Sequence, residues 1–168
     1  MKLHPVEVKT LAPEVFRIFG ERNALLTAGT GERVNTMTIG WCQLGRLWSV
    51  PVCTVYVRPE RYTYPLMEQG DYFTVSVLPE ECGEIMRFCG TKSGRDVDKI
   101  AHCGLTLCRG AGNAPFFEEA EWVLVCRKLY AQDLDAACVT DGTPILHHYK
   151  GQGWHRMYTG EVVEAYAR

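Results

Sequence analysis

The chain has 168 residues, 46% of them hydrophobic and 23% charged, and a formal net charge of -2. This length suits one domain with a substantial core, so we expect a single domain over residues 1–168. The near-neutral charge argues against nucleic acid or an anionic membrane as a partner, and no apolar run approaches the roughly 18 residues of a membrane helix. The N-terminal segment lacks the apolar core of a secretory signal, so a cytoplasmic location is expected.

Eight cysteines are the compositional exception. Without an export signal we expect free thiols rather than disulfides. The closest pairs in the sequence, Cys82 with Cys89 and Cys103 with Cys108, lack the usual spacing of a zinc site, even with His102 beside Cys103. We therefore expect small buried hydrophobes and no metal. A metal-binding or redox-sensing protein built on the cysteines is kept as an alternative.

The predicted elements are mostly strands. Alternation and β-branched or aromatic residues predict strands, in chain order, at Asn23–Gly29, Val34–Gln43, Pro51–Val57, Asp71–Leu78 and Phe117–Leu129, with one or two more in His155–Arg168. Between them we expect a loop and short helix ending at Gly70, a helix over Pro79–Gly90, and a polar loop entering a short helix over Thr91–Gly104. Strands that outnumber short helices predict a mainly β fold, and barrel closure hides sheet edges.

The segment "NTMTIGW" is unusual because one face of the predicted strand carries Thr36, Thr38 and Gly40. Such a face would let a flat ligand lie close to the backbone, with Gly40 permitting the approach and Trp41 and Trp48 as walls. The alternative is a barrel interior of mixed polarity, with both tryptophans in the core.

The segment "CGTKSGRDVDK", Cys89–Lys99, combines small residues with positive charge. Backbone amides at the start of a helix favour an anion, so this loop predicts a phosphate site that uses Lys92, Ser93, Arg95 and Lys99. The alternative is a solvated helix start that is capped by Asp96 and Asp98.

The segment "RPERYT" is a second, weaker candidate for anion binding, with Arg58, Arg61 and Thr63. A salt bridge at the barrel rim is the alternative role for Arg58. Neither GxGxxG nor GxxxxGK[ST] occurs in the chain, which excludes the two standard nucleotide-binding loops.

Four segments, in this order and spacing, resemble the flavin reductase-like FMN-binding family and within it the flavoredoxin-type branch: "NTMTIGW", "VYVRPERYTYPLMEQGDYFTVSVLP", "CGTKSGRDVDK" and "HRMYTGEVVEAY". The likeness extends from Leu11 to the C-terminal strand. It implies a Greek-key-like split β-barrel with FMN at its flank. It also implies a homodimer in which the second subunit helps to close the flavin groove.

The resemblance also implies the site residues. The residues that would contact the flavin are Asn35, Thr36, Met37 and Thr38. The ring edge, ribityl chain or phosphate would be contacted by Val55, Tyr56, Val57, Arg58 and Thr63. The phosphate would be held by Ser93, Arg95 and Lys99. His155 would lie next to the nicotinamide or the flavin, and the alternative is a surface histidine at the barrel end. The segment Gly104–Trp122 would shape substrate access, and its sequence does not indicate which substrate.

The function that the resemblance implies is an NAD(P)H:flavin oxidoreductase. Hydride would pass from NADH or NADPH to FMN and on to a free flavin, a small quinone-like acceptor or a partner protein. The flavin carries this chemistry, so His155 is the one candidate catalytic side chain. The alternative within the family is an FMN electron carrier without a nicotinamide site.

Overall fold

The computed structural model describes residues 3–6 and 15–168. Residues 1–2 and 7–14, including the start of the family likeness at Leu11, lie outside the described residues. None of the described helices has the length and apolar character needed to cross a membrane. The single domain over 1–168 stays a prediction.

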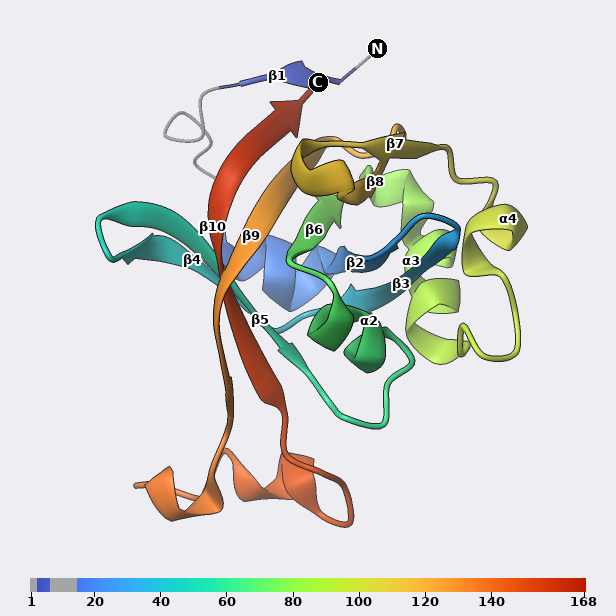
Figure 1. Cartoon of the computed structure of the whole chain (residues 1–168). Coiled ribbons are helices and arrows are strands. Elements are labelled where there is room, and N and C mark those ends of the chain that lie inside the picture. The colour runs from blue at the N-terminus through green and yellow to red at the C-terminus, as the bar shows by residue number, and fades with distance from the viewer. Residues whose placement is uncertain (1–2, 7–14) are drawn as a thin grey trace.

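The strands form a curled antiparallel sheet (Figure 1). Its hydrogen-bonded order is β3 (Arg33–Ile39), β2 (Ala24–Thr30), β6 (Tyr72–Val77), β9 (Trp122–Asp133), β10 (Arg156–Ala167), β5 (Val50–Val57) and β4 (Cys42–Leu47), and β1 (His4–Pro5) also pairs with β10. A separate pair is formed by β7 (Leu107–Arg109) and β8 (Pro115–Phe117). Within the described residues β3 and β4 end the order unpaired with each other, so the predicted mainly β split barrel is confirmed.

The helices are short and lie between the strands. They are α1 (Val15–Arg17), η2 (Ile18–Arg22), α2 (Thr63–Gln69), η3 (Glu80–Cys82), α3 (Gly83–Thr91), α4 (Lys99–Cys103), η4 (Ala111–Asn113), η5 (Ala136–Cys138) and η6 (Leu146–Tyr149). The predicted helices before Gly70, over Pro79–Gly90 and before Gly104 are thus confirmed. The segment 134–155, which contains η5 and η6 and which we call the arm, extends from the bottom of the barrel in Figure 1.

Two predicted strands were wrong in their extent. The strand over Val34–Gln43 is divided at Gly40–Trp41, where the chain passes from one end of the strand order to the other. The strand over Phe117–Leu129 is divided because a turn, closed by the amide of Ala120 donating to the carbonyl of Phe117, separates β8 from β9.

The β4–β5 hairpin turns at two residues that are unusual for this role. Trp48 and Ser49 have φ of 50° and 65°, the left-handed region that favours Gly and Asn. The Trp48 side chain is 56% exposed and packs edge-on to Tyr130, 6.1 Å between ring centroids. Trp48 therefore does not belong to the core, and that predicted role was wrong. Its role as a wall of the site stays a prediction.

The core has two parts, one on each face of the sheet. Leu26 and Phe73 belong to the part inside the barrel, whereas Leu25 and Val125 belong to the part covered by α3 and the β7–β8 pair. Burial of each such side chain contributes about 1.5–3 kcal/mol. Strands covered on both faces form a rigid support for the side chains at their ends.

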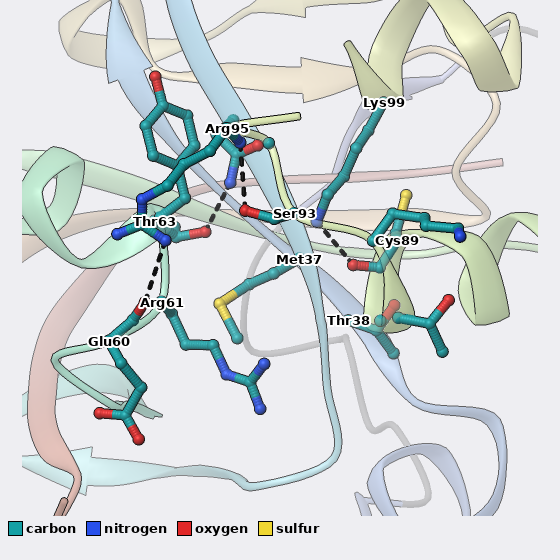
Figure 2. Close-up of a pocket in the computed structure, with 15 residues that line it drawn as sticks. Met37, Thr38, Glu60, Arg61, Thr63, Cys89, Ser93, Arg95 and Lys99 are labelled. Atoms are coloured by element: carbon teal, nitrogen blue, oxygen red, sulfur yellow. Dashed lines mark hydrogen bonds between the residues drawn. The ribbon is translucent and has the colours of Figure 1, made fainter. Parts of the chain in front are cut away.

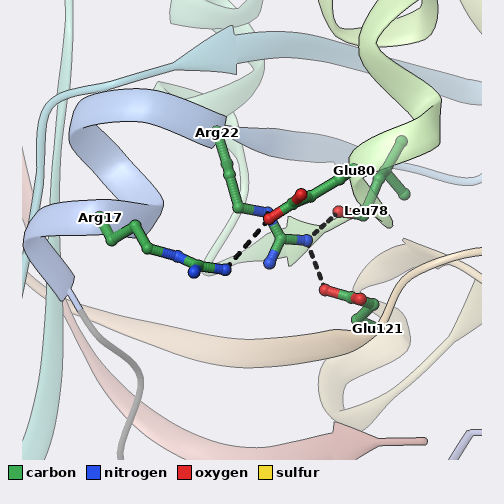
Figure 3. Close-up of polar contacts among 5 residues, drawn as sticks. All are labelled: Arg17, Arg22, Leu78, Glu80 and Glu121. Carbon is green, nitrogen blue, oxygen red and sulfur yellow. Dashed lines mark hydrogen bonds and ion pairs between the residues drawn. The ribbon is translucent and has the colours of Figure 1, made fainter.

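A polar cluster fixes the N-terminal helical segment against the barrel (Figure 3). Arg22 at the end of η2 donates to the carbonyl of Leu78, at 2.7 Å, and pairs with Glu121, while Arg17 pairs with Glu80 at 3.0 Å. These contacts join η2 to the ends of β6 and the segment before β9. The segment is thereby held next to the point where β3 ends.

Candidate functional site

The threonine hydroxyls of β3 are used within the protein. Thr36 is fully buried, and its Oγ1 lies 3.0 Å from that of Thr27 on β2, as the mixed-polarity alternative expects. Thr38 donates to the carbonyl of Met86 on α3, at 2.6 Å. A Cβ on Gly40 would lie 2.6 Å from Oδ1 of Asn23. The close approach at Gly40 is therefore to the chain itself, which corrects the prediction that a ligand needs it.

A cavity of about 240 Å³, which we call the cationic cavity, opens beside β3 (Figure 2). It is lined by Asn35, Met37, Thr38, Glu60, Arg61, Tyr62, Thr63, Cys89, Gly90, Thr91, Lys92, Ser93, Gly94, Arg95 and Lys99. The two sequence segments predicted to bind an anion thus meet at one hollow. Four cationic side chains against one carboxylate make it a favourable place for an anion.

Lys99 is a structural cation of this cavity as well as a lining residue. Its ammonium is buried and donates to the carbonyls of Thr36, at 3.0 Å, and Cys89, at 2.8 Å. Burial lowers the pKa of Lys99 from its usual value. Because these bonds tie β3 to α3, Lys99 fixes the wall of the cavity.

The loop before α4 is stabilised mainly by its own contacts. Asp98 accepts hydrogen bonds from the amides of Ile100 and Ala101, both at 3.0 Å, so the capping alternative is confirmed for Asp98, and these amides do not face an anion. Within the described residues the Asp96 carboxylate makes no such capping bond. Arg95 donates to the carbonyl of Glu60 at 3.1 Å and lies over the Tyr62 ring. Anion binding here must therefore depend on side chains more than on the helix start.

Arg61 is a cation of this cavity that remains available to a ligand. Its guanidinium makes no hydrogen bond or ion pair with any described residue, and it lines both the cationic cavity and the one beside it. The sequence analysis named Arg61 as a candidate for anion binding within "RPERYT", but Arg61 is not among the residues that the family resemblance implies. Its unpaired donors suit phosphate oxygens.

The neighbouring cavity, of about 210 Å³, we call the aromatic cavity. It shares Met37, Thr38 and Arg61 with the cationic cavity and is otherwise lined by Ile39, Gly40, Trp41, Tyr56, Arg58 and His155. Trp41 thus lines a cavity, as the wall prediction expects, and is 40% exposed rather than core.

The predicted site residues divide between these places. Asn35, Met37, Thr38, Thr63, Ser93, Arg95 and Lys99 line the cationic cavity, and Tyr56, Arg58 and His155 line the aromatic cavity. The fully buried side chains of Thr36, Val55 and Val57 line neither cavity, since all three face the interior. These three residues can reach a ligand only through their backbone.

His155 is held by hydrogen bonds at both ring nitrogens. Arg58 Nε donates to Nε2 at 3.3 Å, so the proton lies on Nδ1, which is 3.0 Å from the Tyr149 hydroxyl oxygen. Burial, followed by the charge of Arg58, lowers the pKa of His155 to about 4. His155 is only 9% exposed, so the surface-histidine alternative is wrong. Its place next to the nicotinamide or flavin stays a prediction.

Arg58 holds the arm against the barrel. Besides His155, its guanidinium donates to the His148 carbonyl, at 2.8 Å, and to the Gln152 side chain, and it lies 5.5 Å from the centre of the Tyr149 ring. No carboxylate of the described residues takes part, so the rim salt bridge proposed as its alternative role was wrong. The arm contributes these partners, and sequence patterns gave no sign of them.

The cysteines are all free. Cys42 on β4 and Cys53 on β5 are 11 residues apart in the sequence, and their sulfur atoms lie 3.5 Å from each other. Burial raises the pKa of Cys89 to about 12, which keeps this thiol protonated. Over residues 3–6 and 15–168 no three His, Cys, Asp or Glu side chains are grouped so that they could hold a metal ion.

The comparison with known families agrees with this geometry. The profile described as "Flavin reductase like domain" matches residues 16–168, nearly the whole chain. The chain therefore belongs to the flavin reductase-like family, which confirms the resemblance. No curated protein matches it.

Solved structures support the same fold. A flavoredoxin from Methanosarcina acetivorans is 22% identical, with a TM-score of 0.69 over 88% of this chain and 68% of that one. An FMN-binding protein from Thermus thermophilus with bound p-hydroxybenzaldehyde is 23% identical, with a TM-score of 0.67 over 87% and 71%. An NADH:FAD oxidoreductase from Streptomyces globisporus is 20% identical, with a TM-score of 0.63 over 84% and 72%. At these identities the likeness shows the fold.

Proposed function

We propose that the protein is an FMN-dependent NAD(P)H:flavin oxidoreductase that works in the cytoplasm. The observation that carries the proposal is the continuity of a cationic and an aromatic cavity, with the unpaired Arg61 guanidinium lining both. A ligand with a phosphate at one end and a flat ring at the other has matching partners in this pair. The neighbours named as FMN-binding or as NADH:FAD oxidoreductase support the same class.

The residues present fit FMN. Arg61, Lys92 and Ser93 would hold the phosphate, with Lys99 and Arg95 fixing the cavity walls around it. Trp41 and Tyr56 would flank the ring. The cofactor, when bound, supplies hydride transfer between the nicotinamide of NADH or NADPH and an acceptor, which is a flavin, a small molecule or a partner protein.

The side chains of the aromatic cavity would exclude water and keep their charge constant. His155 is neutral over the physiological range, because its pKa is lowered to about 4 and both of its nitrogens are bonded. It therefore orients Arg58 and Tyr149 and holds its proton at Nδ1. We assign it a positioning role rather than proton transfer.

A homodimer with FMN near the subunit interface is part of the proposal. Leu47, Trp48 and Tyr130 are each at least 40% exposed, and Trp48 and Tyr130 are in contact, so the hairpin tip offers an apolar surface to a partner. Trp48→Glu should shift the sedimentation coefficient towards that of a monomer. A wild-type protein that sediments as a monomer at all concentrations would contradict the dimer.

An absorbance spectrum and a reduction experiment test the enzyme against its alternatives. The purified protein should be yellow or bind added FMN, and anaerobic NADH or NADPH should bleach the flavin band within seconds. Persistent colour would favour an electron carrier instead. A colourless protein that ignores FMN and carries stoichiometric metal or reactive thiols would favour the cysteine-based alternative.

A further inference from the structure

A third cavity, of about 540 Å³, lies between the N-terminal helical segment, the start of β4 and the arm. We call it the apolar cavity. Its walls include Phe19 of η2, Trp41, Tyr56 of β5, and Leu134, Ile145 and Tyr149 of the arm. This volume falls in the range of roughly 300–1,000 Å³ found for small-molecule sites.

The lining of the apolar cavity restricts the charge and the shape of its ligand. The described residues that line it include no Asp, Glu, Lys or Arg. A charged ligand would therefore lose its hydration without gaining an ionic partner. Five of the lining residues are Phe, Trp or Tyr, and such rings favour a flat ligand that stacks on them. An uncharged planar molecule fits both conditions.

Tyr149 provides one directional contact within these apolar walls. Since Arg58 donates to Nε2 of His155, the Nδ1 proton of that histidine is donated to the Tyr149 hydroxyl oxygen. The hydroxyl proton of Tyr149 is then available to a ligand. A carbonyl oxygen is the matching acceptor, and it needs no charge.

The apolar cavity adjoins the proposed cofactor site. Gly40, Trp41 and Tyr56 line both the aromatic and the apolar cavity, so a ligand in one is separated from the other by a single layer of side chains. The arm that forms the outer wall is already fixed by Arg58, through the His148 carbonyl and Gln152. The apolar cavity therefore exists without any ligand.

We propose that the apolar cavity binds an uncharged planar carbonyl compound of the quinone class, with one carbonyl oxygen accepting the hydroxyl proton of Tyr149. Its use as the electron acceptor rests on the proposed function. The overall exchange is then NAD(P)H, one proton and the quinone giving NAD(P)⁺ and the hydroquinone, so that two electrons and two protons reach the two carbonyl oxygens.

Calorimetric titration of the full chain with duroquinone tests this inference. Duroquinone carries a methyl group at each ring carbon that a cysteine could otherwise attack, so reversible binding is measured. Ile145→Trp fills the cavity and should weaken binding at least about tenfold, and Tyr149→Phe, which keeps the ring but removes the donor, about fivefold. Leu146→Trp is the matched control, because Leu146 is exposed and does not line the cavity, and it should change affinity less than about twofold.

A parallel FMN titration separates this inference from the proposed function. Ile145→Trp and Leu146→Trp should bind FMN like the wild type, because neither residue lines the cationic or the aromatic cavity. If the wild type binds duroquinone but does not bind FMN, the proposed function is contradicted and the inference about the apolar cavity stands. The inference is overturned if the wild type fails to bind duroquinone, or if Ile145→Trp and Tyr149→Phe bind it as well as the wild type does. It is also overturned if Ile145→Trp only converts a dimer into monomers, because the cavity is then a subunit contact.

Discussion

The cationic and aromatic cavities share Met37, Thr38 and Arg61 but use their polar groups in opposite ways. In the cationic cavity some charges are fixed by the fold, as with Lys99, while Arg61 has no partner among the described residues. In the aromatic cavity the polar groups of Arg58 and His155 are bonded to one another and to the arm. A ligand that spans both is therefore held by charge at one end and by stacking at the other.

This difference has a practical consequence. Substitutions in the cationic cavity should change either the stability of the protein or its affinity for phosphate, according to whether the charge is already bonded. Substitutions in the aromatic cavity should change affinity modestly and without dependence on salt, because stacking is not screened by ions.

Lys99→Met should lower the free energy of unfolding by about 3 kcal/mol in the absence of flavin, because two buried carbonyls lose a charged donor. Urea unfolding followed by circular dichroism measures this change. The control is Lys92→Met, an exposed lining residue of the same cavity, which should cost less than about 0.5 kcal/mol. Equal stability of the two variants would mean that Lys99 is not the structural cation.

Acid should destabilise the protein through His155. The unfolded state takes up the proton near the usual pKa of 6.5, whereas the folded state does so only near 4. The contribution of His155 to the free energy of unfolding is therefore fully present above about pH 6.5. It is lost as the pH falls towards 4, and the total loss is about 2–3 kcal/mol. Urea midpoints at several pH values measure the loss, and His155→Asn should flatten the curve in this window. An unchanged slope in His155→Asn would argue against the buried neutral histidine.

Arg61→Ala should weaken FMN binding by about 2 kcal/mol, or about thirtyfold, and most strongly at low salt. Flavin fluorescence titration measures the dissociation constant at two salt concentrations. Arg87→Ala is the matched control, because Arg87 is exposed on α3 and lines neither cavity. If both variants bind FMN like the wild type, the phosphate does not lie in the cationic cavity.

Trp41→Leu should weaken FMN binding by about 1 kcal/mol, independently of salt, because it removes a ring from the wall of the aromatic cavity. Leu146→Ala is the control, since Leu146 is exposed and lines neither the cationic nor the aromatic cavity. The same titration applies. An effect in Leu146→Ala that equals or exceeds the one in Trp41→Leu would place the ring elsewhere.

Much of the fold could be predicted from the sequence because it depends on local patterns. Alternation gave β2, β5 and β6 nearly to the residue, and glycines marked the ends of α2 and α4. The split of β3 from β4 was missed because "NTMTIGWCQ" alternates without interruption. Only the tertiary structure shows that the chain changes partners at Gly40–Trp41.

The cationic cavity was also predictable in part. Ser93, Arg95 and Lys99 are close in the sequence, so composition alone pointed to them. The aromatic cavity joins β3, β5 and the last strand, and no local pattern reports that Arg58 meets His148 and His155. The threonines of β3 were misleading because their hydroxyls already have partners in the protein: Thr36 bonds to Thr27 of the sheet, and Thr38 donates to the Met86 carbonyl of α3.

Because β3 and β4 are joined by two residues yet lie at opposite ends of the strand order, we expect the ligand site to form late in folding. The β2–β3 and β4–β5 hairpins can form early from local contacts, whereas the pairings of β6 with β9 and of β5 with β10 connect distant parts of the chain. During refolding, strand content measured by circular dichroism should therefore return before the capacity to quench flavin fluorescence. Flavin capture would then report completion of the whole barrel.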